Sequence, residues 1–235
     1  VTLKSNGIFN SEQAFSVMGI GPQDNIFSID AAELEQRLKK CPAIRRASVK
    51  RQISSNPTLL VDIDARIPVA WIDCPELGIH PGDATYGALA DKEGVIFPCM
   101  EQVHTPYIRE KRMPSVTLRP PSSGKLSYGV SIRELEAPMK LIELLSGTVT
   151  EYLPSIVSIT TPNDWSFCVR FTNDCQATFS HYGLEHQVEK LSRALRHARQ
   201  THRKISSINL IPEHNIPVIF DDSYEDIPLA EPIEE

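Results

Sequence analysis

The sequence predicts an α+β protein, in which a small β-α-α-β-β domain is followed by a β-rich domain with an antiparallel sheet flanked by helices. Capped helical patterns and alternating strands occupy residues 1–67. Short strands separated by Pro, Gly and Ser occupy residues 68–220, and residues 221–235 are acidic and poor in large apolar side chains. We therefore expect two domains, 1–67 and 68–220, and a disordered tail, 221–235.

Two helices are predicted in the first domain by their capping residues. Asn10 precedes an apolar stripe, and Gln13 stands three positions later, where its side chain can reach back to the cap. Asp30 and Glu33 repeat this arrangement before a second stripe, which Pro42 ends. The break between the helices falls at Gly21-Pro22.

Two strands follow these helices. Residues 44–51 alternate and place basic side chains on one face, whereas residues 58–65 place Asp62 and Asp64 on theirs. Asn56-Pro57 predicts the turn between them. Lys50 or Arg46 facing one of these aspartates would help to fix the register, at about 0.2–1 kcal/mol for an exposed pair.

The second domain is predicted from a hairpin signal, two helical stripes and several alternating runs. Leu184, Val188, Leu191, Leu195 and Ala198 form one stripe, with Lys190, Arg193, Arg196, His197 and Arg199 on the opposite face. The expected elements are a hairpin at 89–97, extended connections over 100–130, a helix with Pro138 in its first turn that ends at Gly147, strands near Ile156–Ile159, Trp165–Phe171 and Gln176–Ser180, the helix 184–198, and final strands at 205–211 and 216–220.

Composition excludes several classes of protein. The net charge is −6, but the last fifteen residues carry seven acidic and no basic side chains, so the remainder is close to neutral. A nucleic-acid binder needs a concentrated positive face, and none is expected here. No apolar stretch approaches the roughly 18–20 residues of a membrane-spanning helix.

Five cysteines are present without a C-x-x-C pair, so neither a zinc site nor a thioredoxin-like motif is predicted. In an oxidising compartment Cys74 and Cys99 are the expected disulfide partners, because both would end neighbouring strands. The alternative is that all five are small apolar core residues.

Catalytic signatures are absent from the sequence, and we expect no enzyme, cofactor or metal. Asp62 and Asp64 share a strand face as paired carboxylates would, but that face is expected to be solvated. His181 and His186 are five residues apart, which is poor spacing for two metal ligands on one helical face. An enzyme of another type would need a pocket with convergent titratable groups.

The densest positive cluster lies around the second helix and the strand after it. This basic cluster could face anionic lipid head groups or an acidic partner, or it could simply be solvated. Its members are Lys39, Lys40, Arg45, Arg46, Lys50 and Arg51.

Several short motifs follow one another along both predicted domains. Asn25-Ile26-Phe27 with Ile29-Asp30 precede the second helix. That helix is followed by Leu38, Pro42, Ile44, Ala47, Val49 and Arg51, and the third strand is marked by Pro57-Thr58-Leu59 and Ala65-Arg66-Ile67-Pro68-Val69-Ala70. The second domain contains Leu89-Ala90-Asp91 with Gly94-Val95-Ile96-Phe97, and Lys190-Leu191 with Leu195. The order of these motifs resembles the FtsQ/DivIB family of bacterial cell-division proteins, whose extracytoplasmic part begins with a POTRA domain.

The resemblance implies a non-catalytic scaffold at the periplasmic face of the inner membrane, held by a single spanning helix that would precede Val1. It also implies FtsB/FtsL (DivIC-like) partners that add a strand to the last strand of the β-rich domain, with no small-molecule substrate. The implied partner-binding residues are Arg193, Arg196, Ile208, Leu210, Ile216, Val218 and Phe220. Pro217 supports an edge position but is expected to limit which backbone groups a partner can use. The alternative is a POTRA-containing chaperone or export module of outer-membrane protein assembly.

Overall fold

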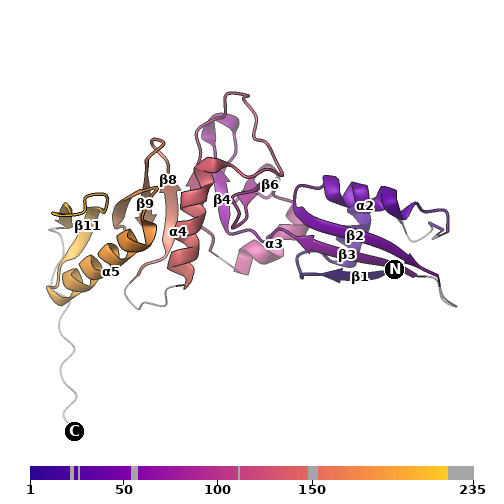
Figure 1. The fold of residues 1–235 in the computed structure, drawn as a ribbon, viewed down its shortest axis with the longest axis horizontal. Coiled ribbons are helices and arrows are strands. Elements are labelled where there is room, and N and C mark those ends of the chain that lie inside the picture. Colours follow the sequence, from indigo (N-terminus) through magenta and orange to yellow (C-terminus); the bar gives the residue numbers. More distant parts are fainter. Residues whose placement is uncertain (22–23, 26, 54–57, 111, 148–152, 222–235) are drawn as a thin grey trace, which may run out of the picture. The chain divides into compact units, whose positions relative to one another are not determined.

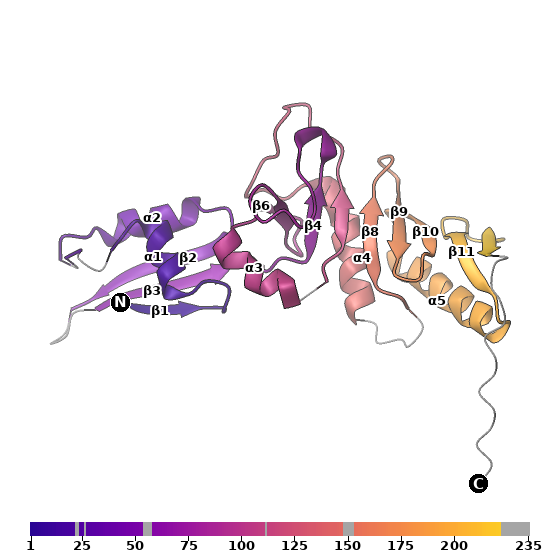
Figure 2. The ribbon, with the colours of Figure 1, turned by 180° about the vertical axis from the view of Figure 1, so that it is seen from behind.

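The computed structural model describes residues 1–21, 24–25, 27–53, 58–110, 112–147 and 153–221. Its internal contacts divide the chain into two compact units, Val1–Met139 and Lys140–Glu235. The elements of both are shown in Figures 1 and 2. Pro22, the Asn56-Pro57 turn and the tail from residue 222 lie outside the described residues, and the predicted domain boundary after residue 67 stays a prediction.

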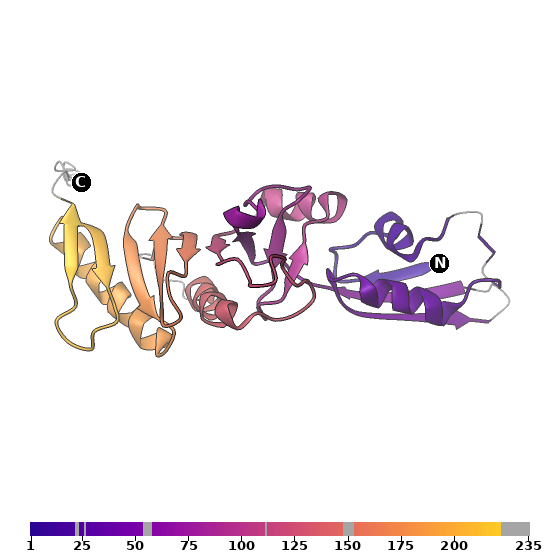
Figure 3. The same cartoon turned by 90° about the horizontal axis from the view of Figure 1, so that it is seen from above.

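The first unit begins with the predicted β-α-α-β-β arrangement, which is confirmed. Its elements are β1 (Thr2–Ser5), α1 (Ser11–Met18), α2 (Ala31–Lys40), β2 (Ile44–Gln52) and β3 (Thr58–Ala65). The strand order is β1-β3-β2, with β1 parallel and β2 antiparallel to β3. Both helices cover one face of this sheet (Figures 1 and 3). They bury Ala14, Met18, Leu34 and Leu38 against the apolar side chains of β2 and β3.

The helix starts follow the predicted chemistry. The Asn10 side-chain oxygen accepts a hydrogen bond from the Gln13 backbone N–H at 2.9 Å, and the Gln13 side-chain amide oxygen accepts from the Asn10 backbone N–H at 2.8 Å. Asp30 accepts from the Ala32 N–H at 2.8 Å. The chain leaves α1 through Gly19 in the left-handed region, at φ 69°.

The register of β2 and β3 confirms one of the expected opposite-charge positions. Arg46 lies opposite Asp64, whereas Lys50 lies opposite Leu60. The Asp62 carboxylate is exposed and lies 4.0 Å from the Lys4 ammonium. Alternate residues of both strands are buried, so the register is set mainly by the apolar face.

The first unit continues with short strands and one further helix. These are β4 (Ala70–Asp73), the 3-10 helix η1 (Pro75–Leu77), β5 (Ala88–Ala90), β6 (Ile96–Pro98), α3 (Glu101–Glu110), β7 (Ser115–Thr117) and η2 (Arg133–Leu135). The strands follow the order β7-β4-β5-β6, and β7 is parallel to β4.

The predicted hairpin is formed by β5 and β6, and its loop is organised by Asp91. The Asp91 carboxylate accepts from the N–H groups of Glu93 and Val95 at 2.9 and 3.0 Å. It also pairs with the Arg66 guanidinium at 2.6 Å, and both side chains are largely buried. Arg66 donates to the Pro42 carbonyl at 3.1 Å as well, so this ion pair ties the end of β3 to the hairpin.

The prediction of extended connections over residues 100–130 is wrong, because α3 occupies Glu101–Glu110 with Pro106 inside it. Pro106 cannot donate to the Gln102 carbonyl, as an ordinary helical residue would. That carbonyl instead accepts from the Gln13 side-chain amide at 2.5 Å. A contact from α1 thus satisfies the group that the proline leaves free.

The second unit contains most of α4 (Glu136–Gly147), followed by β8 (Ile156–Thr160), β9 (Ser166–Phe171), β10 (Gln176–Ser180), α5 (Leu184–Gln200), β11 (Lys204–Asn209) and β12 (Val218–Asp221). The order within this unit is β12-β11-β10-β9-β8. β10 and β11 are parallel, so the sheet, which the sequence predicts to be antiparallel, is mixed at this point. The reason is that α5 serves as the crossover that parallel neighbours require, and it packs against both strands (Figures 1 and 3).

The apolar alternation predicted for β9 is confirmed for three of its four residues. Phe167, Val169 and Phe171 are buried, and the Phe167 ring stacks on Phe179 with centroids 5.6 Å apart. Trp165 precedes β9 and is 59% exposed.

All five cysteines are free thiols, so the expected pairing of Cys74 with Cys99 is not formed. Cys74, Cys99 and Cys175 are buried, whereas Cys41 and Cys168 are half-buried. Burial raises the pKa of the Cys99 thiol to about 11, which keeps it protonated near neutral pH.

Candidate functional site

The last strand, β12, lies at the end of the strand order in the second unit. Among the described strands its neighbour is β11, to which it is antiparallel. Val218 lies opposite Ile208, and Phe220 lies opposite Ile205. The other flank of β12 therefore forms a sheet edge within the part of the chain that the structure describes.

Hydrogen bonding defines which backbone groups of β12 face this edge. The Asn209 N–H donates to the Pro217 carbonyl at 3.0 Å, so the backbone of Pro217 faces β11. Because antiparallel pairs alternate, the N–H and C=O groups of Val218, and by the same alternation those of Phe220, point away from β11. These are the groups that an added strand would use.

This geometry changes the expected role of Pro217. Its missing N–H would have faced β11, so the proline removes a bond within the protein and leaves the outer donors of Val218 and Phe220 unaffected. Pro217 therefore does not limit the outer edge in the way that the sequence predicts.

The side chains of β12 divide between the two faces of the sheet. Val218 and Phe220 are half-buried and share the face of their partners Ile208 and Ile205, which are buried. Ile219 points to the other face and is 64% exposed. A strand added here would meet apolar side chains on both faces.

The Arg203 guanidinium lies 3.5 Å from the centre of the Phe220 ring, a cation–π contact that the sequence analysis missed. The signal was present, because Arg203 stands directly before β11 and Phe220 ends the apolar run of the last strand. The contact fixes the ring next to the edge, and Lys204 pairs with Asp221 at 3.5 Å beside it.

The other predicted partner-binding residues lie in different settings. Arg193 and Arg196 are exposed on α5, and Arg193 lies 3.5 Å from Glu189. Ile208 and Leu210 are buried, so their side chains belong to the core of the unit. Ile216 is half-buried and precedes β12. That these residues contact a partner stays a prediction.

Lys190 does not lie on the exposed basic face that the helical pattern predicts. It is buried, and its ammonium donates to the Pro212 carbonyl at 2.9 Å. This bond ties α5 to the segment between β11 and β12.

The basic cluster of the first unit is not a uniform positive surface. Lys39 pairs with Glu35 at 2.5 Å, and Arg45 lies 3.4 Å from Glu93. Arg51 donates to the Ile29 carbonyl. Lys40, Arg46 and Lys50 are exposed. Half of the cluster thus has contacts within the protein, which weakens its field toward a lipid surface or a partner.

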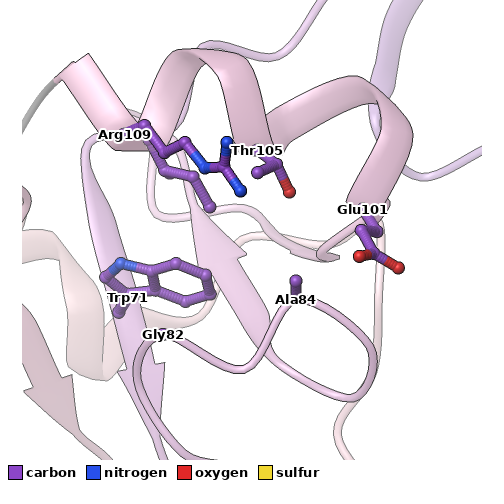
Figure 4. A pocket seen from close by; sticks show the side chains of 7 residues that line it. Trp71, Gly82, Ala84, Glu101, Thr105 and Arg109 are labelled. Atoms are coloured by element: carbon purple, nitrogen blue, oxygen red, sulfur yellow. The ribbon is translucent and has the colours of Figure 1, made fainter.

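The described residues offer little to an enzymatic interpretation. They contain no group of three His, Cys, Asp or Glu side chains that could hold a metal ion. A hollow of about 370 Å³ in the first unit is lined by Trp71, Gly82, Ala84, Glu101, Thr105, Ile108 and Arg109, with Glu101 and Arg109 toward opposite ends of α3 (Figure 4). One carboxylate, one guanidinium and one hydroxyl at separate positions do not form a nucleophile–base pair.

His181 and His186 are likewise not brought together as ligands. The His181 ring packs against Phe167, with centroids 5.5 Å apart, whereas His186 is exposed on α5. No helix within the described ranges is long and apolar enough to cross a membrane.

Comparison with known proteins identifies the start of the chain. Residues 1–64 match the family model described as "POTRA domain, FtsQ-type". These residues coincide with β1 to β3 and the two helices that cover them. No curated protein matches the sequence. Residues 1–64 therefore form an FtsQ-type POTRA domain, which is consistent with the FtsQ/DivIB family of cell-division proteins.

Proposed function

We propose that this protein is a non-catalytic cell-division scaffold of the FtsQ/DivIB type, which recruits an FtsB/FtsL (DivIC-like) partner complex by adding a partner strand to β12. The match of residues 1–64 to an FtsQ-type POTRA domain supports the cell-division role. The outward N–H and C=O groups of Val218 and Phe220 support the proposed binding mode, because an added strand gains its affinity from main-chain hydrogen bonds to such groups.

A comparison with β6 supports β12 as the receiving edge. The Ile96 N–H donates to the Val130 carbonyl at 3.4 Å, and the Gly129 N–H donates to the Ile96 carbonyl at 2.7 Å. Residues 129–131 thus run along β6 and use its backbone groups. No described segment covers β12 in this way.

The proposed location follows from the same family. FtsQ-type POTRA domains belong to division proteins with an extracytoplasmic part, so we place this chain at the periplasmic face of the inner membrane, with a single-pass anchor outside the given residues. The match to the FtsQ-type model favours this function over a POTRA-containing chaperone or export module.

The experiment titrates the chain with the extracytoplasmic part of an FtsB-type partner and measures the Kd by calorimetry. Val218→Pro removes one outward N–H, and we expect the Kd to rise at least about fivefold, since a net hydrogen bond contributes about 1 kcal/mol and the proline ring also obstructs the added strand. Phe220→Ala should weaken binding through the lost apolar contact. The matched control is Pro217→Ala, which adds an N–H on the β11 side.

The control should bind as the parent chain does. Equal Kd values for Val218→Pro, Phe220→Ala and the parent chain would contradict the site assignment. A Pro217→Ala variant that loses binding together with Val218→Pro would show that β12 needs its shape as a whole rather than its outer donors.

A further inference from the structure

β2 is the longest edge strand among the described residues: it has nine residues and ends the order β1-β3-β2. The Val49 N–H does not bond to β3 but donates to the Glu35 carboxylate at 3.1 Å. The backbone groups of Val49 therefore face outward, and the alternation places those of Ala47 and Arg51 on the same side. Glu35, which belongs to α2, thus occupies the middle of this edge.

Glu35 is held in this position by a second contact. Its other carboxylate oxygen pairs with the Lys39 ammonium at 2.5 Å, one turn further along α2. The hydrogen bond from Lys39 and the bond from the Val49 N–H lower the pKa of the Glu35 carboxyl, so it stays an acceptor at neutral pH. Both of its oxygens have a partner.

A neighbouring contact fastens the start of α2 to the same edge. The Arg51 guanidinium donates to the carbonyl of Ile29, which precedes the helix. The helix is therefore tied to β2 at Val49 and at Arg51, which are both positions whose backbone faces outward.

We propose that Glu35 is an edge-protecting residue, which prevents β2 from accepting a foreign strand. Exposed strand edges are sites of unwanted pairing, and covering the edge with a helix or loop is one of the means by which proteins block them. An incoming strand would need the Val49 N–H, and it would have to displace a carboxylate that is bonded to Lys39. This inference goes beyond the proposed function, because it assigns a closed edge rather than an open one.

Glu33 provides a matched control for Glu35. It lies on the same helix and pairs with Arg37 at 2.7 Å in the same i,i+4 arrangement. A merely helix-stabilising role would therefore give Glu35→Ala and Glu33→Ala the same effects. An edge-protecting role makes them different at Val49.

The experiment uses the full chain and measures amide hydrogen exchange by NMR. We expect the Val49 exchange rate to rise at least tenfold in Glu35→Ala and to stay unchanged in Glu33→Ala. As a probe, a peptide with the sequence of β3, Thr58–Ala65, carries two aspartates that suit the exposed Arg46 and Lys50. It should bind Glu35→Ala at least tenfold more tightly than the parent chain.

A double variant tests where the peptide binds. Ala47→Pro removes an outward N–H without removing a bond to β3, so adding it to Glu35→Ala should abolish peptide binding. Unchanged Val49 exchange in Glu35→Ala, or equal peptide binding by this variant and the parent chain, overturns the proposal. If Glu35→Ala does not fold, Glu35→Leu, which also lacks an acceptor for the Val49 N–H, is measured instead, and an unchanged exchange rate there overturns the proposal as well.

Discussion

Replacing Asp91 with Ala is expected to destabilise the first unit more than any exposed charge change would. The Arg66–Asp91 pair is 2.6 Å long, and its side chains are only 12% and 6% exposed. Removing one member of such a pair leaves the other buried without compensation, which costs about 3–5 kcal/mol. The Glu93 and Val95 N–H groups lose their acceptor at the same time.

The assay is urea unfolding followed by tryptophan fluorescence. The chain has two tryptophans, and a Trp165→Phe background leaves Trp71, which is 8% exposed, as the reporter of the first unit. With a dependence on urea of about 2 kcal/mol per molar, a loss of about 4 kcal/mol lowers the midpoint by about 2 M.

Two further variants test how much of this loss of stability comes from the missing hydrogen-bond acceptor and how much depends on burial of the ion pair. Asp91→Asn keeps an acceptor for the two N–H groups while removing the charge, so its loss should be smaller. Asp62→Ala removes an exposed partner of Lys4, at 4.0 Å, and should cost less than about 1 kcal/mol. A midpoint for Asp91→Ala that is no lower than that of Asp62→Ala would refute the reasoning.

Three other outcomes follow from single contacts. Burial lowers the pKa of His104 to about 4, so its neutral form stabilises the fold fully above pH 6.5. Up to about 3 kcal/mol of unfolding free energy is lost as the pH falls from 6.5 to 4. Urea unfolding at several pH values should show that stability depends less on pH in His104→Phe. Asn10→Ala should cost about 1 kcal/mol in the same urea assay, and Ser11→Ala should cost less, since only Asn10 caps α1. Lys190→Met should cost about 1–3 kcal/mol, measured by urea unfolding with Trp165 retained, because the Pro212 carbonyl loses its donor; a cost near zero would mean that water replaces the ammonium.

The sequence predicts the first unit's helices and strands well because local chemistry determines them. The Asn10–Gln13 capping box, Asp30 and the alternation of β2 and β3 all act within a few residues. The sequence does not predict α3, because a proline such as Pro106 normally ends a helix and its position becomes acceptable through a distant side chain, Gln13.

The sequence predicts only part of the candidate edge, because pairing between residues that are not close in the sequence decides the rest. That a strand forms near residue 218 follows from apolar alternation, but which of its N–H groups face outward depends on the pairing of Asn209 with Pro217. Helical periodicity places Lys190 on the exposed basic face, because it does not show that the Pro212 carbonyl lies within hydrogen-bonding distance of this side chain. The Glu35 contact with Val49 has no local signature, since it joins residues fourteen positions apart.

The Gln13 amide has a consequence for how substitutions at Pro106 should be judged. Its oxygen serves the start of α1, while its nitrogen serves the Gln102 carbonyl. An alanine at position 106 would supply that carbonyl with a donor from its own helix, and the two donors would then compete. The usual gain in stability from removing a helix-interior proline is therefore offset by a weakened hydrogen bond between α1 and α3. Pro106, although poorly suited to a helix, leaves the Gln102 carbonyl available to the Gln13 side chain.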